Sequence, residues 1–499
     1  MDNSNLLKEM LSEFNTEHNL DTIELDDTLI TNEHKLDTTE LDDTLITNEQ
    51  LVDTIELDEH IEKIKEINLI NAPPSNYAKL EDKVIPIGIS GLHNIGNTCY
   101  MNSILQCLIQ IPILKNKLLD ISLIKKLHQF IIKDISVEDK NNYSKIICKI
   151  TNTITYQLYK IMTNVWDKNI KHITPIDFKK IISNKIETFR YNEQEDAQEL
   201  LSYILDLVHT ESKYSVNIRY NIFSEEYLQL FAQFDKDNLT DIECCSMEAI
   251  YPDIWELYSL KRTIDCYNKN SYSFITESFQ NIISSKLECP DCNYHSYNFD
   301  LPYIQSIQIP YKLFANTDEI NNKIAQINGI SPEIEQQLRY QLINQQSTNA
   351  VISLEQCLAT FFNIEILDED EKWHCPNCDK KIKAKKQTEI WLCPRIMIIH
   401  LKRFDHYGNK INNLITFPIN NLDINPFMAE YSKKIGIYNY NLISVVNHIG
   451  SMNNGHYYSF VKSITNNNWY CINDNDVIKI DESNINTKDA YILIYQLDE

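Results

Sequence analysis

Residues 91–108 read GLHNIGNTCYMNSILQCL, in which a Gly/Asn-rich turn leads into an amphipathic helix. Asn97 or Thr98 can cap this helix, and Cys99 then lies in its first turn. Unpaired N–H groups and the helix dipole favour a thiolate at such a place. Cys99 is therefore a candidate nucleophile, with a small buried cysteine as the alternative. Its backbone N–H and the side chain of Asn94 are candidate donors to an oxyanion.

A second segment, HIGSMNNGHYYSFVKSITNNNWYCINDNDV at residues 448–477, supplies a candidate base. It reads as strand, Gly/Asn loop, strand, turn and strand, with His456 at the start of the second strand. Asn473 and Asp474 follow 17 and 18 residues later, so a hairpin could bring either one to the Nδ1–H of His456. His448 is a rival base, although no carboxylate follows it at hairpin spacing.

Two pairs of cysteines have the spacing of metal ligands: Cys289-Pro-Asp-Cys292 and Cys375-Pro-Asn-Cys378. Four thiolates suit a tetrahedral Zn²⁺ ion, and each CxxC turn presents two sulfurs to it. Such an ion would be structural, because no ligand position stays open for water. Surface thiols without metal are the alternative.

Composition limits the classes of function. The chain has 499 residues, 43% of them hydrophobic, and a formal net charge of −25. This acidity disfavours nucleic-acid and anionic-membrane partners, and no segment reaches the roughly 18 apolar residues of a membrane span. The 13 cysteines, four of them in CxxC pairs, indicate an intracellular, reducing compartment, the cytoplasm or nucleus.

The chain divides into an acidic tail and a folded body. Eighteen of the 71 acidic residues lie in residues 1–60, where LDTIELDDTLITNEHK and its variants repeat with a period of 16. We expect a disordered tail over residues 1–75, with a partner-docking tail as the alternative. Helical periodicity dominates to about residue 215 and strand-like runs from about 274, which predicts an α+β fold. The polar stretch 315–350 is expected to be an inserted loop or helical excursion.

Together these segments resemble the Cys and His boxes of the ubiquitin-specific proteases, the papain-like deubiquitinases of peptidase family C19. The stretches VVNHIGSMNNGHYYSFV, NWYCINDNDV and AYILIYQ resemble the His box, and QEDAQELL and LCPRIMIIHLKRF resemble internal stretches. The resemblance extends over residues 91–497. It implies a papain-like cysteine peptidase domain at 88–498, with a helical thumb at 88–215 and a β-rich palm and zinc-ribbon fingers at 216–498.

The resemblance also implies site roles. Cys99 would be the nucleophile, His456 the general base and then acid, Asn473 the orienting residue with Asp474 beside it, and Asn94 the oxyanion donor. Four residues would bind the substrate: Asp196 and Glu199 at the basic ubiquitin tail, and Phe404 and Tyr457 along a channel for its Gly-Gly end. Cys289, Cys292, Cys375 and Cys378 would hold one structural Zn²⁺, without a catalytic cofactor.

The implied activity is that of a ubiquitinyl hydrolase, which cleaves the isopeptide, peptide or thioester bond after the C-terminal glycine of ubiquitin. The expected partners are ubiquitin and ubiquitinated proteins. A catalytically inactive ubiquitin-binding adaptor of the same fold is one alternative. A zinc-ribbon nucleic-acid module is another, but its only basic cluster is KKIKAKK at 380–386 in a net-acidic chain.

Overall fold

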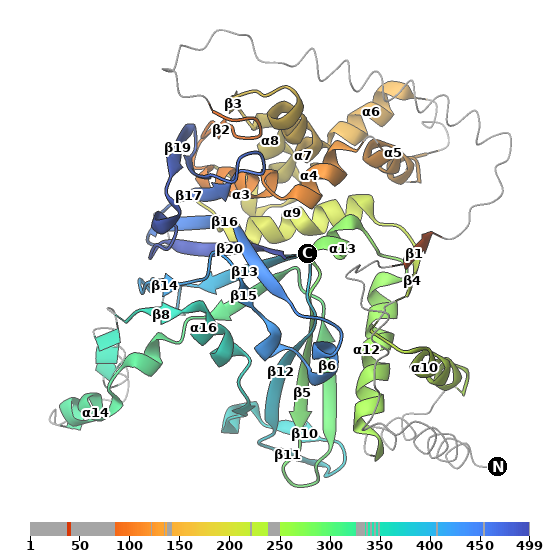
Figure 1. The fold of residues 1–499 in the computed structure, drawn as a ribbon, viewed down its shortest axis with the longest axis vertical. Helices are drawn as coiled ribbons and strands as arrows, with labels where there is room; N and C mark the ends of the chain where they lie inside the picture. The colour runs from red at the N-terminus through yellow and green to blue at the C-terminus, as the bar shows by residue number, and fades with distance from the viewer. Residues whose placement is uncertain are drawn as a thin grey trace.

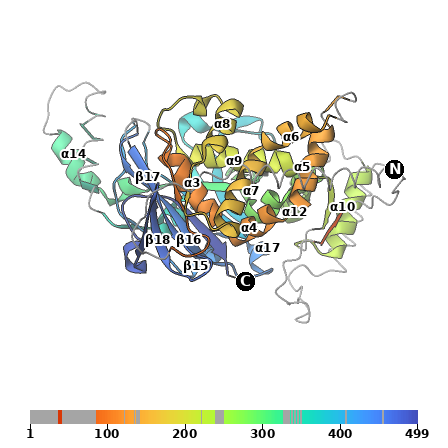
Figure 2. The ribbon, with the colours of Figure 1, turned by 90° about the horizontal axis from the view of Figure 1, so that it is seen from above.

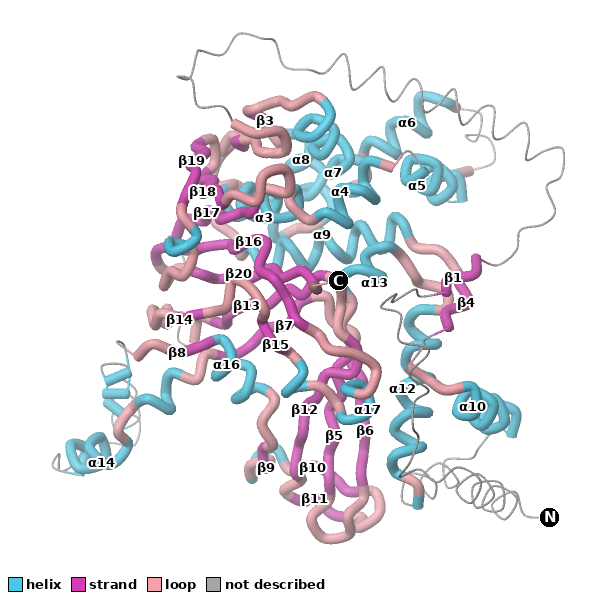
Figure 3. Tube along the Cα trace, in the orientation of Figure 1, coloured by secondary structure: helices cyan, strands magenta, loops and turns pink. Residues whose placement is uncertain are grey.

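The computed structural model describes residues 37–40 and 85–498, with gaps at 121, 134, 137–141, 220–221, 238–249, 326–334, 336–337, 340–341, 344–345, 348–349, 406–407 and 453–454. Helices gather at one end, a large sheet lies in the middle, and a narrow sheet extends away from the helices (Figure 1, Figure 3). This order matches the α+β class predicted from sequence. Most of the expected tail lies outside the described residues. Its strand β1 (Asp37–Glu40) pairs antiparallel with β4 (Val216–Arg219).

The middle layer is an eight-stranded sheet. Its strands follow one another as β19 (Asp476–Ile480), β18 (Trp469–Asn473), β17 (Gly455–Lys462), β16 (Asn439–Gly450), β20 (Ala490–Leu497), β13 (Ile396–Lys402) and β7 (Ile304–Gln308), and β15 (Leu422–Asp423) pairs with β16. Only β13 and β7 run parallel within this sheet. The near-continuous apolar runs of β13 and β20 are buried on both faces, which explains their central position.

The helical layer is built around α3 (Cys99–Ile109), every residue of which is buried. This helix contacts β17 of the sheet on one side and α9 (Ala197–Ser212) on the other. Figure 2 shows α3 between the strands and the remaining helices. Those helices are α4 (Pro112–Leu119), α5 (Ser122–Lys133), α6 (Tyr143–Thr151), α7 (Ile154–Met162) and α8 (Ile176–Lys185). One hydrophobic core joins α3, α4, α7, α8 and α9 to one face of the sheet, and a smaller core packs α5 and α6 against α7.

The narrow sheet has four strands in the order β6 (His295–Asp300), β5 (Ile282–Glu288), β12 (Lys385–Leu392) and β9 (Glu365–Ile366). The hairpin of β10 (Trp373–Cys375) and β11 (Lys380–Ile382) lies at its far end. Two helices, α10 (Glu225–Asp237) and α12 (Pro252–Asn268), lie beside the narrow sheet (Figure 1). They share a hydrophobic core of their own with β5, β6 and β12.

The smaller elements connect these layers. They are β2 (Gly91–Leu92) paired with β3 (His172–Ile173), α13 (Phe274–Phe279), α14 (Thr317–Ala325), β8 (Ile352–Ser353) paired with β14 (Ile415–Thr416), α16 (Leu354–Phe361) and α17 (Glu430–Lys433). Within the polar stretch 315–350, the described helix α14 projects away from the end of the sheet (Figure 1). Across the described ranges, no helix combines the length and apolar character that crossing a membrane requires.

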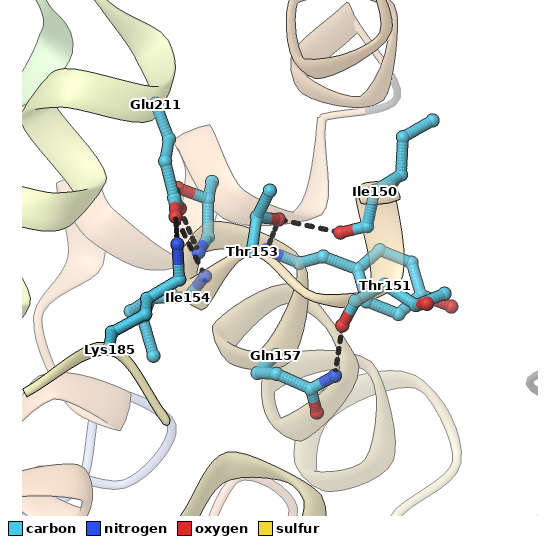
Figure 4. A network of polar contacts seen from close by, with 9 residues as sticks. Ile150, Thr151, Thr153, Ile154, Gln157, Lys185 and Glu211 are labelled. Carbon is cyan, nitrogen blue, oxygen red and sulfur yellow. Dashed lines mark hydrogen bonds and ion pairs between the residues drawn. The ribbon is translucent and has the colours of Figure 1, made fainter. Parts of the chain in front are cut away.

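One buried carboxylate ties the helices together (Figure 4). Glu211, near the end of α9, accepts hydrogen bonds from the backbone N–H groups of Ile154 (3.2 Å) and Thr155 (2.8 Å). These groups open α7, where the helix itself offers no acceptor, so a negative charge is favourable there. Lys185 of α8 lies 3.2 Å from the same carboxylate and neutralises it. Glu211 thereby fixes α7 and α8 on α9.

Candidate active site

Cys99 is the first residue of α3, and its side chain is only 3% exposed. Thr98 occupies the N-cap position, as the sequence allowed, but its side chain makes no capping bond to the helix. Its Oγ1 instead accepts from the N–H of Ile95 (3.0 Å) in the preceding turn. Asn97 adopts a positive φ of 51°, which Asn tolerates better than most residues. The turn thus places Cys99 at a helix start, where free backbone N–H groups can stabilise a negative charge.

His456 lies between Cys99 and Asn473. Its Nε2 is 2.6 Å from Oδ1 of Asn473, and its ring also hydrogen-bonds Cys99. The bond to Cys99, and after it the bond to Asn473, raise the pKa of His456 to about 9 against the opposing effect of burial. An imidazole with this pKa is protonated at neutral pH. The geometry therefore suits a thiolate–imidazolium pair oriented by an amide.

The ring nitrogen that faces Asn473 differs from the expected one. The hairpin argument placed Nδ1–H of His456 against Asn473 or Asp474, whereas the structure places Nε2 there. Asn473 ends β18, the strand beside β17, and the outer nitrogen of the ring reaches it. This leaves Nδ1 for the hydrogen bond with Cys99.

Asp474 hydrogen-bonds to residues 91–108, the segment that carries Cys99, and makes no hydrogen bond to His456 among the described contacts. Its Oδ2 accepts from Nδ2 of Asn94 (3.0 Å) and its Oδ1 from Nδ2 of Asn102 (2.7 Å). Its backbone oxygen accepts from the N–H of Leu92 (2.8 Å). The sequence left open whether Asn473 or Asp474 faces His456. In the structure Asn473 bonds to the histidine, and Asp474 bonds to the segment that carries Cys99.

Asn94 has both ends of its amide fixed. Its Oδ1 accepts from the backbone N–H groups of Gly96 (3.1 Å) and Thr98 (3.1 Å), while Nδ2 donates to Asp474. Sequence reasoning missed Asn102, which is buried on α3 and donates to Asp474. The available signal was a polar residue about one turn after Cys99 on the same helix.

Asp196 is the N-cap of α9. Its Oδ1 accepts from the N–H groups of Gln198 (2.7 Å) and Glu199 (3.0 Å), and its Oδ2 accepts from the hydroxyl of Tyr491 (2.5 Å). The carboxylate is therefore held between the helix and the sheet. Glu199, in the first turn of α9, is half-buried.

Phe404 and Tyr457 belong to an aromatic cluster around His448. The ring of His448 lies 5.5 Å from that of Phe404 and 4.6 Å from that of Tyr457, and Tyr491 completes the cluster. Burial lowers the pKa of His448 to about 4, so it stays neutral. A Cβ on Gly455 would lie 2.0 Å from Nε2 of His448, which explains the glycine there. The rival base is thus a packing residue beneath the hairpin.

The four cysteines of the CxxC pairs converge at the end of the narrow sheet. Sγ of Cys289 lies 3.8 Å from Sγ of Cys378, and Sγ of Cys292 lies 3.7 Å from Sγ of Cys375. All four sulfurs lie within 4.8 Å of one another. A tetrahedral ion with metal–sulfur bonds of about 2.3 Å separates its sulfurs by about 3.8 Å, so this donor set fits Zn²⁺. The four residues can hold one metal ion.

Comparison with known proteins gives the family. Residues 90–495 match the family described as ubiquitin carboxyl-terminal hydrolase. The chain belongs to the ubiquitin carboxyl-terminal hydrolase family. It is therefore a cysteine peptidase of the ubiquitinyl hydrolase class, as the resemblance in its two boxes predicted.

The chain is similar in sequence to three relatives and in fold to one solved structure. It is 26% identical over 462 residues to a probable ubiquitin carboxyl-terminal hydrolase of Acanthamoeba polyphaga mimivirus, which covers 82% of the chain and 90% of that protein. It is 26% identical to human ubiquitin carboxyl-terminal hydrolase 2 (82% of the chain, 55% of that protein) and 28% to ubiquitin carboxyl-terminal hydrolase 4 of Saccharomyces cerevisiae (81% and 39%). The chain thus spans about half or less of these two cellular relatives.

The solved SAGA DUB module bound to monoubiquitin has the same fold, with a TM-score of 0.51 and 20% identity over 91% of this chain and 77% of that chain. The papain-like fold expected from sequence is confirmed. The helical layer is the thumb, the eight-stranded sheet the palm, and the narrow sheet with its four cysteines the fingers.

Proposed function

We propose that this ubiquitin carboxyl-terminal hydrolase is a deubiquitinating protease that cleaves the bond after the C-terminal glycine of ubiquitin with Cys99, His456 and Asn473. The observation that supports this most directly is the hydrogen-bonded chain from Cys99 through His456 to Asn473, with a pKa of about 9 at the histidine. Such a pair supplies a thiolate nucleophile and a protonated acid at neutral pH.

The reaction follows from these groups. The Cys99 thiolate attacks the carbonyl carbon of the terminal glycine and forms a tetrahedral oxyanion. His456 then gives its proton to the departing lysine amine, and the C–N bond breaks to leave a thioester. His456, now neutral, takes a proton from water, which attacks the thioester, and the Cys99 thiolate leaves as the ubiquitin carboxylate forms.

The oxyanion would be held by two N–H donors on the segment that carries Cys99. The backbone N–H of Cys99 opens α3, and Nδ2 of Asn94 carries a second hydrogen beyond the one given to Asp474. Because Asp474 and the turn N–H groups fix both ends of the Asn94 amide, this donor is pre-organised. Asp474 therefore acts through Asn94.

Substrate would enter between the thumb and the palm. Asp196 and Glu199 offer carboxylates at the start of α9 to the basic ubiquitin tail, and Phe404 and Tyr457 form apolar walls for its narrow end. A separate cavity of about 380 Å³ lies between α9 and the segment that joins β6 to β7, and is lined by Ser202, Asp206, Tyr303 and others. The SAGA DUB module is solved with monoubiquitin bound, which supports ubiquitin as the ligand class.

The remaining assignments are proposals of the same kind. Cys289, Cys292, Cys375 and Cys378 would hold one structural Zn²⁺, which would fix the fingers without taking part in the reaction. The catalytic domain would occupy residues 88–498 and follow an acidic tail at 1–75. Reduced thiols at Cys99 and at the metal site require an intracellular, reducing compartment.

Labelling with a ubiquitin C-terminal electrophile tests this function. We expect stoichiometric labelling of wild type, none of Cys99→Ala, and normal labelling of Cys266→Ser, which alters an exposed thiol on α12. Hydrolysis of a fluorogenic ubiquitin substrate should fall by at least about a thousandfold in Cys99→Ala, while ubiquitin binding persists. Labelling of wild type at a cysteine other than Cys99 would overturn the assignment. Binding without hydrolysis by wild type would indicate the inactive adaptor.

A further inference from the structure

Residues 191–195 span the gap between the two segments that carry Cys99 and His456. They connect the short 3-10 helix Thr188–Arg190 to α9. The backbone oxygen of Asn192 accepts a hydrogen bond from Nδ2 of Asn97 (2.9 Å), in the turn before Cys99. Oε1 of Gln194 accepts one from the N–H of Gly455 (2.6 Å), the residue before His456. The span thus contacts both sides of the site.

Gly455 lies at the loop end of the hairpin formed by β16 and β17, directly before His456. Gly455 is the first residue of β17 and pairs with Gly450 at the last position of β16. Only glycine fits at this position, because a Cβ on Gly455 would clash with the ring of His448. Besides its pairing with β16, the start of β17 is therefore held from outside the hairpin by Gln194.

Both ends of the span are fixed to the thumb. Lys179, buried on α8, donates from Nζ to the backbone oxygens of Phe189 (2.8 Å) and Tyr191 (3.3 Å). At the other end, Asp196 caps α9 and bonds to Tyr491. With four residues between Tyr191 and Asp196, the Gln194 side chain is held in place although it is exposed.

We infer that Gln194 is a positioning residue, which fixes the start of β17 through the N–H of Gly455 and so holds His456 against Cys99. It touches neither reacting atoms nor the imidazole. Losing the anchor would loosen the hydrogen bond between His456 and Cys99 and reduce the population of the thiolate. The inference rests on the proposed roles of Cys99 and His456.

The test measures Cys99 in the enzyme without ubiquitin. The rate of Cys99 alkylation by iodoacetamide is followed from pH 4 to 10 by mass spectrometry, alongside kcat and KM on a fluorogenic ubiquitin substrate. Gln194→Met keeps the length of the side chain and removes the acceptor. We expect slower alkylation at neutral pH by fivefold or more, a rising limb displaced to higher pH, about tenfold lower kcat and KM within twofold.

Two further variants make the result specific. Gln194→Glu keeps an acceptor for the same N–H and should restore most of the alkylation rate and kcat. Gln229→Ala changes an exposed glutamine on α10 and should match wild type. All variants should unfold thermally within about 2 °C of wild type.

Three results would overturn the inference: a wild-type alkylation profile in Gln194→Met, a change in KM alone, or equal loss in Gln194→Met and Gln194→Glu. A wild-type enzyme that alkylates rapidly at Cys99 but does not cleave ubiquitin would contradict the proposed function. The positioning role of Gln194 would then still be decided by the alkylation profiles.

Discussion

Nε2 of His456 lies 2.6 Å from Oδ1 of Asn473, and the same imidazole hydrogen-bonds Cys99. Both partners raise the pKa of His456, to about 9, because each bond favours the protonated ring. His456 therefore keeps its proton at neutral pH. Its raised pKa contributes stability to the folded enzyme that is complete below the ordinary histidine pKa of about 6.5 and is lost as pH rises through about 9.

The alkaline limb of the activity profile should report this titration. We expect kcat/KM of wild type to fall above about pH 9, as His456 loses its proton. Asn473→Ala removes one of the two hydrogen bonds that raise this pKa, so the limb should move to lower pH and kcat should drop roughly tenfold or more. Asn473→Asp retains an acceptor and should keep the limb high. An unchanged limb in Asn473→Ala would contradict the assigned role.

Asp474 should behave differently from its neighbour. Asp474→Asn preserves the side-chain shape and the left-handed backbone (φ 50°), but one acceptor oxygen becomes an amide that faces Asn94 or Asn102. We expect kcat to fall about tenfold through the displaced oxyanion donor. The alkaline limb should move to lower pH by less than in Asn473→Ala, because the charge of Asp474 is the smallest of the causes that raise the pKa of His456. Asp476→Asn, at an exposed position two residues away, is the matched control. A displacement of the limb as large as that in Asn473→Ala would contradict the different roles of the two residues.

Local pattern predicted part of this site well. The helix start at Cys99, the strand at His456 and the two CxxC turns each depend on residues a few positions apart, and the structure has all of them. Sequence reasoning missed Asn102, Gln194 and Tyr491, since their partners lie 372, 261 and 295 residues away. Which nitrogen of His456 faces Asn473 depends on ring orientation in the assembled sheet, which no spacing encodes.

The metal site predicts a dependence of the fingers on zinc. Purified, reduced protein should contain one Zn²⁺ per chain, and chelation should lower the thermal unfolding midpoint, because metal binding contributes free energy to folding. Cys378→Ser should reduce zinc content and stability together, whereas Cys148→Ser, at an exposed cysteine of the thumb, should change neither. Metal analysis that finds no zinc in the wild type would contradict the site.

We expect the buried carboxylate of Glu211 to affect the stability of the fold, although it lies outside the active site. Glu211→Gln keeps the size of the side chain but removes the charge that faces the start of α7 and Lys185 (Figure 4). A buried amide NH₂ would then face N–H donors, so we expect a loss of about 1–3 kcal/mol, read as a lower midpoint in urea. Glu187→Gln, at a largely exposed carboxylate, should be neutral. Equal midpoints for both variants would mean that the network contributes little.

Deleting residues 1–75 tests whether the tail belongs to the enzyme. The deletion removes β1 from the edge of β4 but none of the catalytic or zinc-binding residues. Because β4 pairs only with β1 among the described strands and lies away from α3 (Figure 1), we expect kcat on a fluorogenic ubiquitin substrate to stay within a few-fold of wild type.

Either deviation from that result has a physical meaning. A rise in activity would indicate that the acidic tail competes with ubiquitin's basic face, and the rise should then shrink at high salt, where exposed charges are screened. A fall of tenfold or more, about 1.4 kcal/mol of transition-state stabilisation, would contradict the domain boundary and make the repeats part of the catalytic unit. Replacing only residues 37–40 by a Gly/Ser stretch separates these cases, because it removes the strand and leaves most of the tail's charge in place.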